Sequence, residues 1–204
     1  MATLPPSPPL GTLIDNGSLE LVELLSLDDY GILYRAFDTR SLTPISYTVK
    51  CFPRAHAFPS SRRRQLHLRE IRLHKLASAH PNIVSLHRVV EDKDFTYIIM
   101  DHYEDGNLFT QILHRSRYLG QGELVKDVFL QLLNAVEYNH SLGIYHRDLK
   151  PETVVCFDNG MRVAITDFGL VTTDAFSEEF GTGSANYMSP GIHQYRLLIL
   201  DFLR

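Results

Sequence analysis

The most informative stretch of the chain is GIYHRDLKPET, residues 143–153, which is followed at 166–169 by Thr-Asp-Phe-Gly. Between the two lie the apolar run 154–157 and an Asp-Asn-Gly triplet at 158–160. Such a triplet between two β-rich runs is a strong signal for a β-hairpin. The hairpin would fold Asp148 and Asp167 back towards one another, with Lys150 nearby.

Two carboxylates near one lysine suit a reaction in which one acid receives a proton and the other holds a divalent metal on a polyphosphate. For any single aspartate a solvated turn is the more usual role. The ordered string His-Arg-Asp-Leu-Lys-Pro-Glu at 146–152, with Asp-Phe-Gly at 167–169, resembles the catalytic and metal loops of the protein kinase family. The lysine after the Asp-Leu pair resembles the serine/threonine branch.

The resemblance implies a role for each residue of this stretch. Asp148 would accept the proton of the substrate hydroxyl, and Lys150 would steady the transferring phosphoryl group. Asp167 would bind Mg²⁺ bridging the β- and γ-phosphates of ATP. Thr153 stands where the family has an asparagine as second metal ligand, and a hydroxyl is a weaker donor. Loss of one preorganised electrostatic group commonly costs about 10²–10³ in rate.

Alternating apolar runs predict strands at 21–25, 32–37 and 45–52 and a hairpin at 89–100, which together make a five-stranded sheet. By resemblance, the turn at 26–31 is the loop that covers the nucleotide phosphates. The family pattern asks for three glycines there, and only Gly31 is present. Ser26 and Asp28 occupy the other two positions, so we expect weak phosphate binding.

Three further positions in the N-terminal half of the chain match nucleotide-binding residues of the family. Leu33 would cap the adenine ring, and Lys50 would reach the α- and β-phosphates. Glu70 lies on a predicted helix over 61–78 with a charged outer face, and it would orient Lys50. The alternatives are core packing for Leu33, a solvent-exposed strand position for Lys50, and a surface helix position for Glu70.

Residues 101–107 resemble the hinge between the two kinase lobes. The backbone of Asp101 and Tyr103 would bind the adenine edge, Asn107 would reach the ribose, and Val155 would support adenine from below. Apolar residues at helical spacing then predict an amphipathic helix over 125–136, and Gly143 is placed to end this helical stretch.

The activation segment of the resemblance covers 170–190. Ser184 would hydrogen-bond to the catalytic aspartate and lysine, while Thr182 and Ser177 are candidate phosphorylation sites with ordinary loop polarity as the alternative. At Gly191 the resemblance stops, and 191–204 has no counterpart in the family.

Composition narrows the class of protein. A net charge of −4 provides no basic field for nucleic acid. No apolar run reaches membrane-spanning length and the start does not resemble a signal peptide, so we expect no membrane partner and a cytoplasmic or nuclear location. Cys51 and Cys156 lie in apolar runs and read as reduced core thiols, although a disulfide is the alternative. Oligomeric state is not indicated.

These observations predict an α+β, two-lobed protein-kinase-like fold with a complete N-terminal β-rich lobe and an incomplete C-terminal helical lobe. The expected boundaries are a flexible Pro-rich lead-in at 1–18, a kinase domain at 19–190 (small lobe 19–100, hinge 101–107, partial large lobe 108–190) and a tail at 191–204. The expected function is ATP- and Mg²⁺-dependent phosphorylation of protein Ser or Thr, impaired by truncation, in a chain that folds poorly alone. The alternative is a catalytically deficient, pseudokinase-like fragment that binds a nucleotide or a partner.

Overall fold

The computed structural model describes residues 7–28, 31–54, 61–175 and 182–188. The chain divides into two units: Met1–Ile71 with Val84–Tyr103, and Arg72–Ile83 with Glu104–Arg204. The first is built on a β-sheet and the second contains most of the helical residues, so the predicted α+β class is confirmed. One boundary, between Tyr103 and Glu104, falls within the predicted hinge. The segment Arg72–Ile83, expected in the small lobe, groups instead with the second unit.

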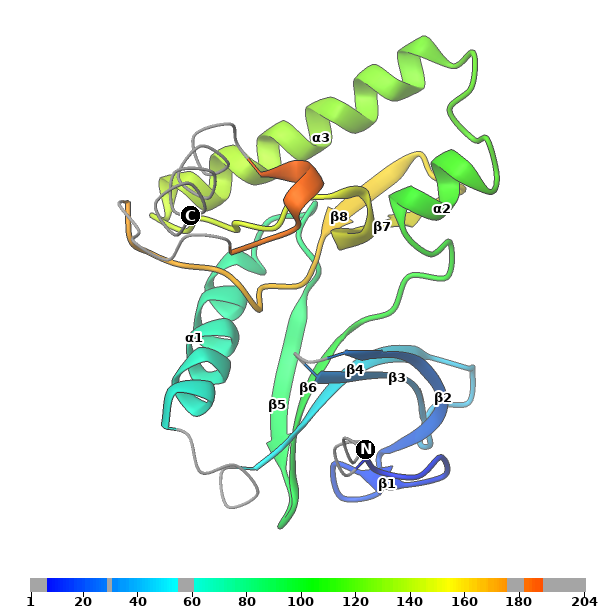
Figure 1. The fold of residues 1–204 in the computed structure, drawn as a ribbon. Helices are drawn as coiled ribbons and strands as arrows, with labels where there is room; N and C mark the ends of the chain where they lie inside the picture. The colour runs from blue at the N-terminus through cyan, green and yellow to red at the C-terminus, as the bar shows by residue number, and fades with distance from the viewer. Residues whose placement is uncertain (1–6, 29–30, 55–60, 176–181, 189–204) are drawn as a thin grey trace, which may run out of the picture. The chain divides into compact units, whose positions relative to one another are not determined.

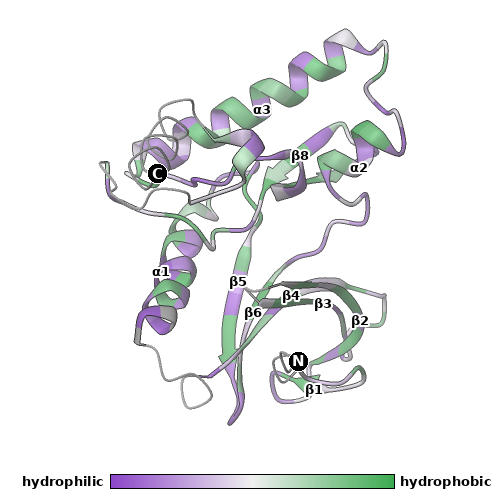
Figure 2. Ribbon diagram, viewed as in Figure 1, coloured by the Kyte–Doolittle hydropathy of each residue, from purple (hydrophilic) through white to green (hydrophobic). Residues whose placement is uncertain are grey.

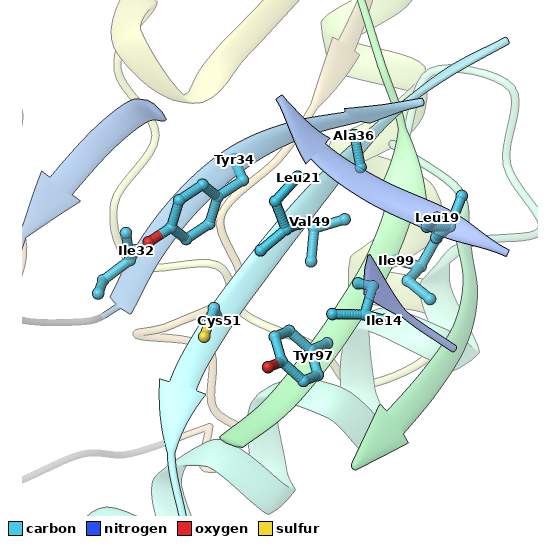
Figure 3. Packing of buried hydrophobic residues seen from close by; sticks show 10 residues of the cluster. All are labelled: Ile14, Leu19, Leu21, Ile32, Tyr34, Ala36, Val49, Cys51, Tyr97 and Ile99. Carbon is cyan, nitrogen blue, oxygen red and sulfur yellow. The ribbon is translucent and has the colours of Figure 1, made fainter. Parts of the chain in front are cut away.

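The first unit holds a curled antiparallel sheet, six-stranded in the described residues, with the order β1-β2-β3-β4-β6-β5 (Figure 1). Its strands are β1 Leu13–Ile14, β2 Leu19–Asp28, β3 Gly31–Asp38, β4 Ser46–Pro53, β5 Leu86–Glu91 and β6 Phe95–Asp101. Successive side chains of a strand point to opposite faces. In β3, Ile32, Tyr34 and Ala36 are accordingly buried while their neighbours are partly exposed. They join Leu21, Val49, Tyr97 and Ile99 in one apolar core (Figure 3).

Residues 7–18 differ from the flexible lead-in expected over 1–18. Strand β1 pairs with β2 through Leu13↔Glu20 and Ile14↔Leu19, and the Ile14 side chain lies in the core. The buried Tyr34 hydroxyl donates a hydrogen bond to the carbonyl of Pro8 at 2.7 Å. The expectation of a flexible segment and a five-stranded sheet is therefore wrong for the described part. A two-residue strand leaves no periodicity from which it could have been predicted.

Asp15 fixes the turn between β1 and β2 to the far edge of the sheet. Its Oδ2 accepts hydrogen bonds from the Ser18 hydroxyl at 2.7 Å and from Arg88 Nε and Nη2 at 2.8 and 2.6 Å. The Ser18 hydrogen bond lowers the pKa of Asp15 most, and together with the Arg88 guanidinium it outweighs the opposing effect of burial. The carboxylate thus joins β1 to β5 as long as it stays ionised.

We expect Asp15→Asn to reduce the free energy of unfolding at pH 7 by about 0.5–1 kcal/mol, because the ion pair is partly exposed. The folded pKa lies below the ordinary value of 3.8. The stabilisation is therefore fully present above that value and is lost as pH falls through the folded pKa. Urea unfolding of both chains from pH 7 to pH 3 checks this, with exposed Asp127→Asn as the control. A difference that persisted unchanged at pH 3 would contradict it.

Helix α1, Ser61–Ala77, confirms the helix predicted over 61–78. The second unit continues with α2 Leu108–Leu113, α3 Gly122–Ser141, the 3-10 turn η2 Pro151–Thr153, strands β7 Val154–Phe157 and β8 Arg162–Ile165, and the 3-10 turn η3 Ala185–Tyr187. Helix α3 contains the predicted 125–136. Beyond its C-cap, Gly143 adopts φ +68°, and its N–H donates to the His140 carbonyl, which ends the helix as predicted.

Helix α3 packs against the β7–β8 hairpin. Val128 forms an apolar cluster with Val154, Cys156 and Val163. Ala135 belongs to a second apolar cluster, which includes Ile165 and Phe168. Both cysteines are free and buried, as predicted, and burial raises the pKa of Cys51 to about 12 and that of Cys156 to about 11.

Helix α3 also carries apolar side chains away from this core. Val125, Phe129 and Leu133 remain exposed, Phe129 at 59%. Figure 2 shows hydrophobic colour along the length of α3. Despite these residues, no helix in the described ranges is long and apolar enough to cross a membrane.

Asn139 is a polar residue on the buried side of α3. It shares this side with Val128 and Ala135, which lie eleven and four residues earlier. Its side-chain nitrogen and oxygen are both buried and have no hydrogen-bond partner among the described residues. An unsatisfied buried polar group costs about 1–3 kcal/mol.

We therefore expect Asn139→Leu to raise the free energy of unfolding by about 1–3 kcal/mol. Asn134→Leu, at an exposed position of the same helix, is the matched control and should leave stability within about 0.5 kcal/mol. Urea unfolding followed by circular dichroism measures both. Destabilisation by Asn139→Leu would show that the amide is satisfied in solution.

Candidate functional site

In the first unit, Lys50 of β4 and Glu70 of α1 form a buried ion pair. Lys50 Nζ lies 2.5 Å from Glu70 Oε1, and the side chains are only 5% and 4% exposed. The pairing expected from the sequence is therefore present in the structure, whereas an exposed strand lysine and a surface helix acid are excluded. Burying two charges is costly, and the close hydrogen-bonded contact between them offsets part of that cost.

Gly31 lies against this lysine. A Cβ built on Gly31 would stand 3.2 Å from Lys50 Cε, and the residue has φ +148°. A side chain here would press on Lys50 and strain the backbone. The glycine thus leaves room for the Lys50 side chain in addition to any role towards phosphate.

The loop before Gly31 is shorter than predicted. Strand β2 continues to Asp28, and the ladder pairs Ser26 with Leu33 and Asp28 with Gly31. The expectation that the whole of 26–31 forms a turn is therefore wrong, because both substituted glycine positions lie in the strand. Residues 29–30 lie outside the described part of the chain.

The predicted hinge residues lie at the end of β6. The Asp101 N–H donates to the Ser85 carbonyl, and its carboxylate lies 2.6 Å from His87 Nε2. Both groups are used within the sheet, so an adenine contact by Asp101 would rest on its carbonyl. The adenine roles of Asp101, Tyr103, Leu33 and Val155 stay predictions.

Asn107 has a structural role that the sequence interpretation missed. Its Oδ1 accepts a hydrogen bond from Thr110 N at 2.9 Å and caps the start of α2. The signal was an asparagine directly before the apolar run Leu108-Phe109. A ribose contact stays a prediction and would have to coexist with this cap.

In the second unit, Asp148, Lys150 and Ser184 form a closed network. Lys150 Nζ lies 2.9 Å from Asp148 Oδ2 and donates to Ser184 Oγ at 2.7 Å. Ser184 N donates to Asp148 Oδ1 at 2.8 Å. These are the contacts expected of Ser184 from the sequence, made to a carboxylate whose residue is 8% exposed.

The charges of this network follow from its hydrogen bonds. Burial alone would raise the pKa of Asp148, but hydrogen bonds from Lys150 and Ser184 outweigh it and the pKa is lowered. Burial alone would lower the pKa of Lys150, but the hydrogen bond and charge of Asp148 outweigh it and the pKa is raised. Both groups are therefore charged at neutral pH.

The predicted hairpin brings Asp167 to the same network. Strands β7 and β8 pair from Val154↔Ile165 to Phe157↔Arg162, with Asp158 and Asn159 at φ 53° and 56° in the turn. The charges of Asp148 and Asp167 both act on Lys150 and on His146.

Asp167 and Arg147 each adopt a left-handed backbone, with φ 62° and 68°. Such angles are strained for non-glycine residues and cluster at functional sites. Arg147 is held by its Nε donating to the Leu170 carbonyl at 2.6 Å.

His146 and Phe168 form the buried support of these strained residues. His146 Nε2 lies 2.9 Å from the Thr166 carbonyl, and burial lowers the pKa of His146 against the opposing effect of that carbonyl and both carboxylates. Phe168 is fully buried, with His74 stacked on it at 4.4 Å and His146 against it at 5.2 Å. His74 is thus part of the buried packing around Phe168.

Thr153 uses its hydroxyl within the catalytic loop, residues 146–153. Its Oγ1 donates towards the Asp148 carbonyl at 2.9 Å and the Lys150 carbonyl at 3.1 Å, and it accepts from Lys150 N at 3.2 Å. The residue is 3% exposed. The role of Thr153 as a metal ligand stays a prediction, and these hydrogen bonds would compete with metal binding by the same oxygen.

Metal binding in this unit would rest chiefly on Asp167. Within the described ranges, no group of three or more His, Cys, Asp or Glu side chains could hold a metal ion. Mg²⁺ in phosphoryl-transfer sites is usually held by one or two carboxylates together with substrate phosphates. A single carboxylate near a lysine fits that pattern.

The activation segment is described in part. Thr182 and Ser184 lie in the described range 182–188, whereas Ser177 and the tail 191–204 lie outside the described residues. Gly183 brings the segment against the catalytic loop, since a Cβ there would lie 2.5 Å from the Arg147 carbonyl oxygen and φ is +104°.

We expect Gly183→Ala to push Ser184 away from Asp148, because backbone contact leaves no space for a methyl group. Without the Ser184 hydrogen bonds, the pKa of Asp148 should rise. A ¹³C-detected NMR titration of the Asp148 carboxyl measures it. Ala185→Ser, a similarly small change two residues on, is the control, and an unchanged pKa in Gly183→Ala would contradict the close approach.

Comparison with known proteins agrees with this arrangement. The family model described as "Protein kinase domain" matches residues 29–196. The chain is 42% identical over 173 residues to the "Negative regulator of sexual conjugation and meiosis" of Schizosaccharomyces pombe, covering 85% of this chain and 36% of the relative. It is 42% identical over 125 residues to "Serine/threonine-protein kinase SKS1" of Saccharomyces cerevisiae (61% and 24%).

A plant relative, "CBL-interacting protein kinase 9" of Oryza sativa subsp. japonica, is 35% identical over 181 residues, covering 86% of this chain and 38% of the relative. The chain thus spans about a quarter to two fifths of the length of these relatives. The match covers both units and includes every residue of the Asp148 network. The chain belongs to the protein kinase family, and within it to the eukaryotic serine/threonine kinases.

Proposed function

We propose that the chain carries the ATP- and Mg²⁺-dependent phosphoryl-transfer site of a kinase that phosphorylates Ser or Thr hydroxyls of proteins. The observation that carries the proposal is the ionised Asp148 held between Lys150 and Ser184. A fixed carboxylate next to a fixed cation is what positioning a hydroxyl and stabilising a transferring phosphoryl group require.

Asp148 would accept the hydrogen of the substrate hydroxyl. Its lowered pKa makes it a weak base in solution terms, so its main contribution is to orient the hydroxyl and to take the proton as the P–O bond forms. Lys150, charged and 2.9 Å from Asp148 Oδ2, would stabilise negative charge on the phosphoryl oxygens.

Lys50 would hold nucleotide phosphate. Its ammonium lies 2.5 Å from Glu70 Oε1 and its side chain is only 5% exposed, so the contact with Glu70 fixes the direction of the lysine side chain. Asp167 would bind Mg²⁺, which neutralises the β- and γ-phosphates when present. Asp28, in place of a glycine, adds negative charge and predicts weak nucleotide affinity.

The substrate class rests on relatives and on Lys150. Two relatives are named serine/threonine kinases of Saccharomyces cerevisiae, and a third is named so in Schizosaccharomyces pombe. The lysine two residues after the catalytic aspartate matches that branch. Protein Ser or Thr is therefore the acceptor we propose.

A second function is favoured by specific residues. Ser26, Asp28 and Thr153 replace the groups that the family uses towards phosphate and metal. A chain with these replacements would bind nucleotide or a partner protein without efficient transfer.

We expect weak, Mg²⁺-dependent ATP binding by the chain, reduced about tenfold or more by Lys50→Ala or Asp167→Asn, since each removes one charge from the phosphates or metal. Lys126→Ala and Asp127→Asn, on the exposed side of α3, make the same chemical changes away from both clusters. Calorimetric titration of all five chains with ATP and Mg²⁺ measures this. Tight binding that both site variants left unchanged would contradict the proposal.

We expect Asp148→Asn to lower the rate of phosphate transfer to a generic protein substrate by about 10²-fold or more while ATP still binds, because the proton acceptor is lost. Transfer of radiolabelled γ-phosphate to casein or myelin basic protein measures the rate. ATP binding with no transfer by the unchanged chain would favour the second function. Equal transfer by both chains would contradict the role of Asp148.

A further inference from the structure

We infer that Thr153 is a positioning residue that closes the catalytic loop, and that it does not serve as a metal ligand. The statement that Thr153 does not bind a metal rests on the proposed function. The statement that it closes the loop rests on hydrogen bonding alone. Every polar group of Thr153 is engaged within its own unit. The N–H donates to the Lys150 carbonyl at 3.0 Å, and the carbonyl accepts from Thr166 N at 3.0 Å.

The hydroxyl joins the C-terminal end of the loop to its middle, at Asp148 and Lys150. Its one hydrogen points towards the Asp148 and Lys150 carbonyls, at 2.9 and 3.1 Å, and one lone pair accepts from Lys150 N at 3.2 Å. A hydroxyl has one donor and two acceptor sites. The bonds therefore fix the backbone on both sides of Leu149, and with it the direction of the Asp148 and Lys150 side chains.

These hydrogen bonds, which brace the loop, leave little of the Thr153 hydroxyl available to bind a cation. A metal needs an oxygen that faces it, whereas this oxygen sits inside the loop with 3% of the residue exposed. A metal bound there would repel the Lys150 N–H and pull the oxygen away from its partners. Mg²⁺ also favours carboxylates and phosphates with near-ideal octahedral geometry.

Asparagine and threonine differ here in one chemical respect. An asparagine carries its donor and its acceptor on separate atoms, so the nitrogen can hold the Asp148 carbonyl while the oxygen faces a metal. Threonine carries both on one atom. Thr153 thus keeps the loop closed and leaves Asp167 as the protein ligand for a metal on the nucleotide.

Three variants of the full chain separate the two roles. Thr153→Ser keeps the hydroxyl, Thr153→Val removes it at nearly the same volume, and Thr153→Asn supplies separate donor and acceptor atoms. Amide exchange of Lys150 without nucleotide tests the brace. We expect Thr153→Val to speed it about two- to tenfold, the effect of losing one hydrogen bond, and Thr153→Ser to keep it unchanged.

Metal stoichiometry tests the other half. With a non-hydrolysable ATP analogue, electron paramagnetic resonance of Mn²⁺ should show one bound ion for the unchanged chain, Thr153→Ser and Thr153→Val, and a second, weaker ion for Thr153→Asn. Two ions in the unchanged chain and one in Thr153→Val would overturn the inference by making Thr153 a ligand. Unchanged Lys150 exchange in a folded Thr153→Val would overturn it by removing the brace.

A kinetic readout distinguishes positioning from simple stability. We expect Thr153→Val to lower kcat with little change in KM for ATP, since the misplaced group is Asp148, and Thr153→Ser to restore kcat. An increase in KM with kcat unchanged would point instead to nucleotide binding. If no chain bound the ATP analogue, the proposed function would fail, and the exchange measurement would still decide the brace.

Discussion

The arrangement of the second unit depends on keeping the Asp148 carboxylate charged while it is almost fully buried. A buried carboxylate without donors would take up a proton. Lys150 and the Ser184 N–H supply the donors, and each comes from a different segment. The loop 146–153, the activation segment and the close backbone approach at Gly183 therefore depend on one another. Displacing any of them would expose or neutralise the Asp148 carboxylate.

In the first unit the buried charged group is a cation. Lys50 is buried beside Glu70, and Gly31 leaves the space in which the lysine side chain lies. The sheet beneath them is fixed further than expected by residues 7–18, through β1, Asp15 and the contact of Tyr34 with Pro8. A single strand position, Lys50, is thus supported both by a helix acid and by the close pairing of β3 with β4.

The sequence predicted features that rest on strong local signals. The Asp-Asn-Gly turn, the amphipathic α3, its end near Gly143 and the pairing of Lys50 with Glu70 were all predictable, since each follows from periodicity, turn chemistry or a matched motif. Strand β1 was missed because two residues carry no period. The extent of β2 through Ser26 and Asp28 was missed because turn residues there suggested a longer loop. The capping by Asn107 had a local signal, an asparagine directly before an apolar run, but the family resemblance assigned that side chain to a ribose. The internal bonds of Thr153 had no such signal, because the same side chain can face a ligand or its own backbone.

The departures from the family pattern fall on one kind of contact. Asp148, the proposed proton acceptor, and its partners Lys150 and Ser184 are all present and joined. The replaced groups, Ser26, Asp28 and Thr153, are those that would face phosphate or metal. Two of them have been absorbed into strand β2 and the third into the catalytic loop. Because a hydrogen-bonded loop can keep its shape without a metal ligand, loss of the ligand at 153 need not disturb Asp148. Under the proposed function, the contacts that would place a hydroxyl at Asp148 are therefore separate from the positions 26, 28 and 153 that would face phosphate or metal, so a change at the latter need not disturb the former.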